Sequence, residues 1–264
     1  MGISLAMANA AKPGLVILAA LVLGSFPASA QVNVLISGGF SGPYEKLLPE
    51  FERANGIKVT TGSGASQGTG PQTIGAQLAR GVPADVVILS REGLGELIAA
   101  KRIAAGTDVD LAQVPIGVAV RANAPKPDVS TVDAFKQILL KAKTVAVPAS
   151  TSGIFLTKEV FPRLGIADKI NVVMTPRGAG ATAMVAAGEA DFAVMPVSEI
   201  VHAPGVDLVG TIASEIQLIQ VFSAAIVAGS KEVESGKRLI EFLSSARASD
   251  AIKASGMERL ATSR

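Results

Sequence analysis

Four Gly/Ser-rich turns constrain the fold of this chain most strongly. They span Ser37–Gly42, Gly62–Gly70, Ala149–Gly153 and Arg177–Gly180, and each follows a short β-branched, apolar stretch and precedes a helix-like pattern. Such a turn places unpaired backbone N–H groups and small hydroxyls at a helix N-terminus, where the helix dipole favours negative charge. One turn of this kind is ordinary in α/β proteins. Four in one chain predict that several helix ends converge on one small anion.

The pattern around these turns predicts an α/β fold. Strands are expected at Val32–Ile36, Ile57–Thr61, Val86–Leu89, Pro115–Val120, Thr144–Val147, Asn171–Met174, Phe192–Met195 and Asp207–Ile212, with a further extended stretch at Ile216–Ala228. Helices are expected at Pro43–Asn55, Pro71–Arg80, Leu94–Ile98, Val132–Lys143, Ile154–Leu164, Ala181–Ala187 and Glu232–Ala246. Strands that alternate with helices at these lengths are typical of doubly wound, mainly parallel α/β sheets.

The order of the elements predicts two doubly wound α/β lobes joined by two extended crossings. We expect residues 31–113 and 226–264 to form lobe 1 and residues 114–225 to form lobe 2, with crossings at Val114–Val120 and Leu218–Ile226. Opposed α/β lobes hold a ligand between them, outside the carboxyl ends of the strands. Because all four turns directly follow strands, we expect them to face that cleft.

The N-terminal residues 1–30 are typical of a secretory signal peptide. Lys12 precedes a small and apolar run, Gly14–Gly24, and Ala28-Ser29-Ala30 follows as a cleavage site. The alternative is a membrane anchor, but the run is short for spanning a bilayer. We therefore expect cleavage near Ala30, export to the periplasm, and a mature protein that is not embedded in the membrane.

Charge and composition exclude several classes of function. Without Lys12, 23 basic residues face 22 acidic ones, and no basic stripe with interleaved aromatics predicts nucleic-acid binding. The absence of cysteine excludes disulfides, thiol catalysis and thiolate metal sites. The single histidine, His202, excludes metal sites with two histidines, and its loop-like surroundings favour simple exposure over catalysis. We expect no metal, no cofactor, a monomer, and a small anionic ligand as partner.

Several segments resemble the molybdate-type (type II) periplasmic solute-binding proteins. The resemblance lies in Val32–Gly39, Gly56–Val59, Ser152–Ile154, Gly188–Val194 and, most specifically, Gln77–Val86 with its Gly-Val-Pro-Ala-Asp run. It covers nearly the whole mature chain in order. It implies the type II periplasmic-binding-protein fold, an anionic ligand held between the lobes, and delivery of that ligand to an ABC-type permease.

The resemblance also implies where the ligand binds. The family's first serine position is Gly39 here, with Ser37 two residues earlier; Ser66 keeps the second serine, and the family's tyrosine position falls near Met195. Glycine in place of serine opens volume, and the guanidinium of Arg177 suits a carboxylate, so a roomier cleft for an organic acid is expected. The predicted ligand-binding residues are Ser37, Gly38, Gly39, Phe40, Ser66, Ser152, Arg177, Gly178 and Met195.

Each of these residues also has a plainer interpretation. Arg177 could be a surface arginine, the glycines could serve only their turns, and Ser66 and Ser152 could be helix N-caps. These alternatives remain open at the level of sequence.

The second turn, Gly64–Ile74, resembles a branch of the family that includes aconitate isomerase. Interconversion of cis- and trans-aconitate by an allylic proton shift needs carboxylate clamps and a base, but no metal or nucleotide. The candidate catalytic residues are Glu199, Asp85 and Ser66, with Glu45 a weaker candidate. Asp85 could equally cap a strand turn, and Glu199 a helix that begins at Ser198.

Two functions follow from these patterns. The favoured hypothesis is a periplasmic binding protein that captures a small carboxylate or oxyanion for an ABC-type importer. The alternative is an aconitate isomerase that uses the same cleft; it ranks second because no motif identifies the base. A metal-dependent hydrolase is disfavoured because the chain lacks a suitable set of ligands.

Overall fold

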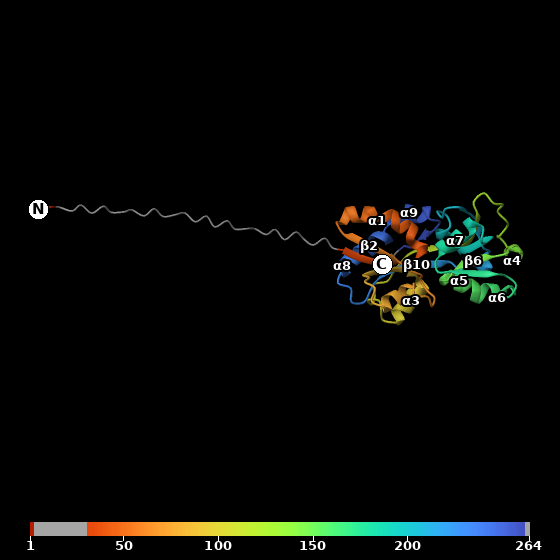
Figure 1. The fold of residues 1–264 in the computed structure, drawn as a ribbon, viewed down its shortest axis with the longest axis horizontal. Coiled ribbons are helices and arrows are strands. Elements are labelled where there is room, and N and C mark those ends of the chain that lie inside the picture. The colour runs from red at the N-terminus through yellow and green to blue at the C-terminus, as the bar shows by residue number, and fades with distance from the viewer. Residues whose placement is uncertain (3–30, 262–264) are drawn as a thin grey trace.

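The computed structural model describes residues 1–2 and 31–261, and residues 31–261 form two α/β lobes lying side by side (Figure 1). Residues 3–30 of the expected signal peptide lie outside the described residues. Each lobe is built on one sheet, and α1, α3 and α8 in Figure 1 belong to one lobe while α4, α6 and α7 belong to the other. We call the lobe that holds β1 lobe 1 and the lobe that holds β6 lobe 2. The α/β, two-lobed fold class expected from sequence is confirmed.

The sheet of lobe 1 has the order β11-β4-β10-β3-β1-β2. Its strands are β1 (Gln31–Ile36), β2 (Lys58–Ser63), β3 (Val86–Ser90), β4 (Val109–Val114), β10 (Gln220–Ile226) and β11 (Glu258–Arg259). Its helices are α1 (Ser41–Asn55), α2 (Ile74–Ala79), α3 (Arg91–Ala99), α8 (Val233–Ser244) and α9 (Ser249–Ala254). β1, β2 and β3 run parallel, whereas β10 pairs antiparallel with β3 and β4. All five residues of β3 are buried, as its continuous apolar run predicts.

The sheet of lobe 2 has the order β7-β6-β8-β5-β9. Its strands are β5 (Ile116–Arg121), β6 (Val145–Pro148), β7 (Val172–Thr175), β8 (Phe192–Pro196) and β9 (Val206–Thr211). Its helices are α4 (Val132–Lys141), α5 (Thr151–Phe155), the π-helical turn η2 (Leu156–Val160), α6 (Phe161–Arg163) and α7 (Gly178–Ala187). β6, β7 and β8 run parallel, so their carboxyl ends meet at one edge. That edge faces lobe 1.

The chain passes between the lobes in extended conformation, but one crossing differs from expectation. Pro115 alone separates β4 of lobe 1 from β5 of lobe 2. On the way back, residues 220–225, which the sequence pattern placed in lobe 2, pair with lobe 1 as part of β10. The physical reason is that β10 lies between β3 and β4 and packs Phe222, Ala224 and Ile226 into the core of lobe 1. We propose that the lobe boundaries lie at Pro115 and at residues 217–219.

Three elements of lobe 1, namely β4, α9 and β11, were not expected from the sequence. β4 was missed because Asp110 and Gln113 interrupt its apolar pattern, and α9 and β11 lie beyond the expected last helix. Within the described residues, no helix has both the length and the apolar character needed to span a bilayer.

All four Gly/Ser turns begin at or next to the carboxyl ends of strands. They follow β1, β2, β6 and β7, two in each lobe. Ser37 N donates to Ile88 O, and Gly64 N donates to Ile36 O, so the two turns of lobe 1 are held side by side on β1 and β3. Because parallel strands end at the same edge of a sheet, the turns of the two lobes confront each other across the gap between them.

Candidate functional site

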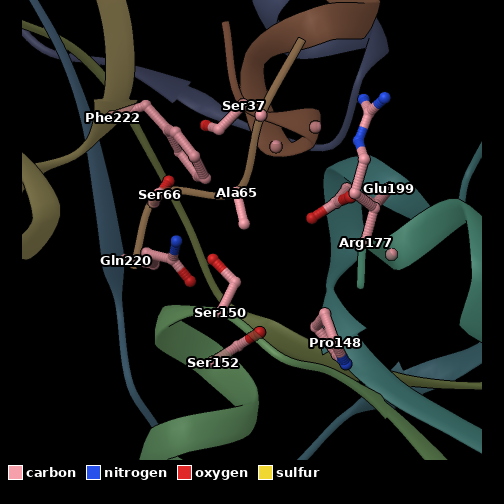
Figure 2. A pocket seen from close by; sticks show the side chains of 14 residues that line it. Ser37, Ala65, Ser66, Pro148, Ser150, Ser152, Arg177, Glu199, Gln220 and Phe222 are labelled. Atoms are coloured by element: carbon pink, nitrogen blue, oxygen red, sulfur yellow. The ribbon is translucent and has the colours of Figure 1, made fainter. Parts of the chain in front are cut away.

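One cavity between the lobes gathers residues from all four turns (Figure 2). It encloses about 320 Å³ of space, including its opening to solvent. Only about 20 Å³ of this space can hold the centre of a water-sized sphere, roughly enough for one water molecule, so a larger solute would need the lobes to move apart. Its lining consists of Ser37, Gly38, Gly39, Gly64, Ala65, Ser66, Pro148, Ser150, Ser152, Arg177, Gly178, Glu199, Gln220 and Phe222.

Three buried polar atoms of this lining have no hydrogen-bond partner among the described residues. They are Ser37 Oγ, Gln220 Oε1 and Arg177 Nε. Buried polar groups in proteins are nearly always hydrogen-bonded, so three unpaired ones around one cavity indicate a place where a polar ligand binds. Ser66 adds a fourth group: its Oγ accepts a hydrogen bond from Ser90 N at 3.0 Å, which leaves its own O–H free to donate.

Arg177 reaches across the gap between the lobes. It precedes α7 in lobe 2, and its Nη1 donates to Ser63 Oγ at the end of β2 in lobe 1, at 2.7 Å. The side chain is half-buried and lines the cavity. The geometry therefore favours a role in the cavity over the alternative of an exposed surface arginine.

Glu199 is the one carboxylate among the described residues that line this cavity, and it faces the open space in Figure 2. It follows β8 in the short helix η3 (Val197–Glu199). Burial raises the pKa of Glu199 to about 7, and the positive charge of Arg177 only partly offsets this rise. Gly38 of lobe 1 and Gly178 of lobe 2 both lie directly against the carboxylate. A Cβ added at either position would collide with Glu199 Oε2. The Glu199 carboxylate therefore lies at the interface between the two lobes.

Two predicted ligand-binding residues lie outside the cavity lining. Phe40 is fully buried in the core of lobe 1, and Met195 is fully buried in a core cluster of lobe 2. The expected extra space above Gly39 is also absent, because the ring of Phe222 occupies it: a Cβ on Gly39 would collide with that ring. The cleft is therefore less roomy than the exchange of serine for glycine suggested.

Asp85 lies away from the cavity, where it stabilises lobe 1. Its Oδ2 accepts hydrogen bonds from Asn33 N and Asn33 Nδ2, and its Oδ1 accepts one from Ser230 Oγ. Asp85 precedes β3, so it lies at the amino end of the sheet, opposite the four turns. The plainer interpretation, a carboxylate that ties strand ends together, fits these contacts.

The serines of the cavity are not side-chain N-caps in this structure. Ser66 receives its bond from Ser90, not from a helix that it precedes, and Ser152 lies inside α5. Both are buried and line the cavity with Ser37.

Of this lining, the residues predicted from the sequence lacked Gly64, Ala65, Pro148, Ser150, Gln220 and Phe222. Gln220 carried a signal, since it is a polar residue within the long apolar stretch Ile216–Ala228. Phe222 carried none, because an aromatic residue in a strand is ordinarily core. Ser150 lies within a turn already identified, one position after its first residue.

The lobes touch each other directly beside the cavity. Ser90 Oγ of lobe 1 and Thr151 Oγ1 of lobe 2 are hydrogen-bonded at 2.7 Å in a fully buried position. His202 Nε2 of lobe 2 lies 3.0 Å from Ala254 O of lobe 1, and His202 itself is exposed, as expected. The structure is therefore a closed arrangement. In the part of the chain that it describes, no group of three or more His, Asp or Glu is placed to hold a metal ion.

Comparison with known sequences identifies the family. Residues 32–258 match the family model of bacterial extracellular solute-binding proteins. The chain belongs to this family. The match covers most of the described residues of this solute-binding protein, and it confirms the family resemblance expected from the sequence.

Individual relatives of this solute-binding protein are of two kinds. An aconitate isomerase from Pseudomonas sp. is 39% identical over 251 residues, covering 91% of this chain and 94% of that protein. The periplasmic molybdate-binding protein of Azotobacter vinelandii has a TM-score of 0.65 at 19% identity, covering 86% of this chain and 98% of that one. The sulfate-binding protein SubI of Mycobacterium tuberculosis H37Rv has a TM-score of 0.68 at 18% identity, covering 88% and 87%. At such identities the solved structures establish the shared fold.

Proposed function

We propose that this protein is an isomerase that interconverts cis- and trans-aconitate in the cavity between its lobes. One observation carries the proposal: Glu199, an acid whose pKa is raised to about 7, lies in a cavity that is otherwise equipped for an anion. A permanently charged carboxylate in such a place would repel an anionic ligand. A carboxyl group that gains and loses its proton near neutral pH is instead suited to general acid–base catalysis.

The chemistry asked of Glu199 is a single proton shift. Trans-aconitate carries a methylene group next to its double bond, and Glu199 as base removes one of the two methylene protons. The C–H electron pair spreads over the three-carbon allyl unit and the adjoining carboxylates. Return of a proton to the far carbon moves the double bond and yields the cis or the trans isomer, so atoms and charges balance.

The rest of the cavity is suited to hold the substrate and stabilise that charge. The free Nε of Arg177 offers a charge-assisted hydrogen bond to a carboxylate. The hydroxyls of Ser37, Ser66 and Ser152 offer neutral donors from both lobes. Such donors act most strongly in a site that excludes water. The relative at 39% identity, whose name is aconitate isomerase, supports the choice of substrate.

The test is to incubate purified protein with trans-aconitate and to follow the cis isomer by proton NMR. We expect the wild-type protein to bring the two isomers to equilibrium and Glu199→Gln to be slower by roughly 10²–10⁴-fold, the usual contribution of a general base. Glu189→Gln, an exposed acid after α7, is the matched control and should act like the wild type. An unchanged isomer ratio with the wild-type protein would rule out the isomerase.

A second candidate is a periplasmic receptor that passes a small anion to an ABC-type importer, as a monomer. The unpaired polar atoms of the cavity and the direct contacts between the lobes favour it, because they suit tight enclosure of a ligand. A thermal-shift screen of molybdate, tungstate, sulfate, citrate, tricarballylate and both aconitates tests it. Stabilisation should grow as RT ln(1 + [L]/Kd). Stabilisation without turnover would favour the receptor, and no stabilisation by any anion would contradict both functions.

A further inference from the structure

A second hollow adjoins the cavity and shares a wall with it. It is lined by Gly38, Ser41, Gly42, Glu45, Arg177, Ala179, Thr182, Ala183, Ser198, Glu199, His202, Ala203 and Pro204. It encloses about 890 Å³, including open solvent. Gly38, Arg177 and Glu199 line both spaces, so Glu199 stands between the cavity and a larger hollow that also opens to solvent.

The groups that face Glu199 across this hollow can carry protons. Glu45 on α1 and His202 beyond η3 are both exposed titratable side chains, and Arg177 supplies the fixed positive charge. Ser198 Oγ is buried in the same lining and has no partner among the described residues. These groups come from both lobes, and the histidine is the only one in the chain. Nothing in the proposed isomerisation itself uses Glu45, His202 or Ser198.

We propose that Glu199 exchanges its proton with solvent through the hollow lined by Glu45 and His202, so that the hydrogen delivered to the product comes from solvent. This inference rests on the proposed function. Glu199 takes a proton from the methylene carbon as the C–H bond breaks, releases it into the hollow, receives another from solvent and gives that one to the far carbon. One proton is lost and one is gained, and the electron pair stays in the substrate.

The alternative is that Glu199 returns the proton it has just removed. A carboxyl group sealed into a closed cavity would have no other choice. Exchange is possible because Glu199 also lines the solvent-open hollow. A substitution that fills this hollow, at a residue outside the cavity, should block the exchange. Ala183 on α7 is exposed and lines the hollow, whereas Ala187, one turn further along α7, is exposed but does not line it.

The experiment compares Ala183→Trp with its matched control, Ala187→Trp, in D₂O. The readout is the fraction of newly formed isomer that carries deuterium, measured by NMR or mass spectrometry at low conversion. We expect close to one deuterium per turnover for the wild type and for Ala187→Trp. Ala183→Trp should retain the substrate's own hydrogen in several-fold more product. Because the readout is a ratio per turnover, a simple loss of rate does not change it.

Two results would overturn the proposal: wild-type product that carries the substrate's own hydrogen, or equal deuterium content in Ala183→Trp and the wild type. A double variant, Glu45→Gln with His202→Gln, should lower deuterium content in the same direction as Ala183→Trp.

A second readout separates this proposal from the isomerase itself. At pH 5 the carboxyl C=O band of Glu199, assigned by its loss in Glu199→Gln, shifts in the infrared when the protein is moved into D₂O. We expect this shift to be several-fold slower in Ala183→Trp than in the wild type or Ala187→Trp. If the wild type isomerises nothing, the proposed function fails while this rate still decides the exchange route; equal rates in all three would refute the route.

Discussion

At the scale of single residues, one cation and one acid share the wall of the cavity without forming an ion pair within the described residues. Arg177 instead donates to Ser63, and Glu199 keeps a pKa of about 7 despite the neighbouring charge. Below that pH, the pair presents a positive charge and a neutral donor to a ligand. This combination favours a polycarboxylate more than two fixed opposite charges would.

Removal of the cation tests this balance. Arg177→Ala should weaken the binding of a carboxylate ligand by about 1.5–3 kcal/mol, the usual contribution of a hydrogen bond to a charged group. Isothermal titration calorimetry with citrate or trans-aconitate gives the affinity. Arg163→Ala, an exposed arginine of lobe 2, is the control. Equal affinities for Arg177→Ala and the wild type would mean that the guanidinium does not touch the ligand.

The raised pKa of Glu199 makes folding stability depend on pH. Its ordinary pKa is 4.5 and its value in the folded protein is about 7, so between these pH values the folded state holds more protons than the unfolded state. The stabilisation is complete below pH 4.5 and is lost as the pH rises through 7. Between pH 4.5 and 8, thermal unfolding should show that Glu199→Gln loses about 3 kcal/mol less stability than the wild type. Parallel curves would mean that Glu199 has an ordinary pKa.

At the scale of elements, each strand positions polar groups at a definite end. Residues that follow β1, β2, β6 and β7 reach the cavity, whereas Asp85, which precedes β3, lies at the opposite edge. The sequence held this information, because Asp85 comes directly before the apolar run that predicted β3. Chain direction thus separates Glu199, which follows β8, from Asp85 as a candidate base.

Asp85→Ala tests this assignment. The substitution leaves the part-buried N–H of Asn33 without its partner and removes the bond to Ser230, so we expect a loss of about 1–3 kcal/mol in folding stability. For a chain of this size that corresponds to a fall in Tm of roughly 2–4 °C per kcal/mol. Ligand affinity at the cavity, measured well below Tm, should stay at the wild-type value. If Asp85→Ala greatly weakened ligand binding without changing stability, Asp85 would have to belong to the ligand-binding site.

At the scale of the whole molecule, three polar contacts among the described residues join one lobe to the other. The Ser90–Thr151 bond is buried, and the Arg177–Ser63 and His202–Ala254 contacts lie nearer solvent. Each contact joins one lobe to the other, so together they favour the closed arrangement even without ligand. A bound ligand would then further stabilise a closed arrangement that the contacts between the lobes already favour.

Thr151→Val removes the buried contact between the lobes while it keeps the shape of the side chain. We expect the unliganded variant to populate a more open arrangement, with a larger radius of gyration in small-angle X-ray scattering than the wild type. Saturating ligand should bring the two proteins to the same value. Thr157→Val, whose hydroxyl donates only to Gly153 O and Ile154 O in the preceding α5 of the same lobe, is the control. Identical scattering of unliganded Thr151→Val and wild type would show that this bond does not hold the lobes together.

The sequence by itself determined the alternation of strands and helices and the placement of four Gly/Ser turns at strand ends. Because parallel strands end at a common edge, it also brought Ser37, Ser66, Ser152, Arg177 and Glu199 to one cavity. These are local patterns plus one rule of sheet geometry.

Only the tertiary structure decided which further residues line that cavity and what sets the charge of its carboxyl group. It buried Phe40 and Met195 in the cores, moved β10 into lobe 1 and so placed Gln220 and Phe222 at the site. It also set the pKa of Glu199, since burial between Gly38 and Gly178 joins segments about 140 residues apart in the chain. Such burial depends on packing between lobes, and no local pattern in the sequence encodes it.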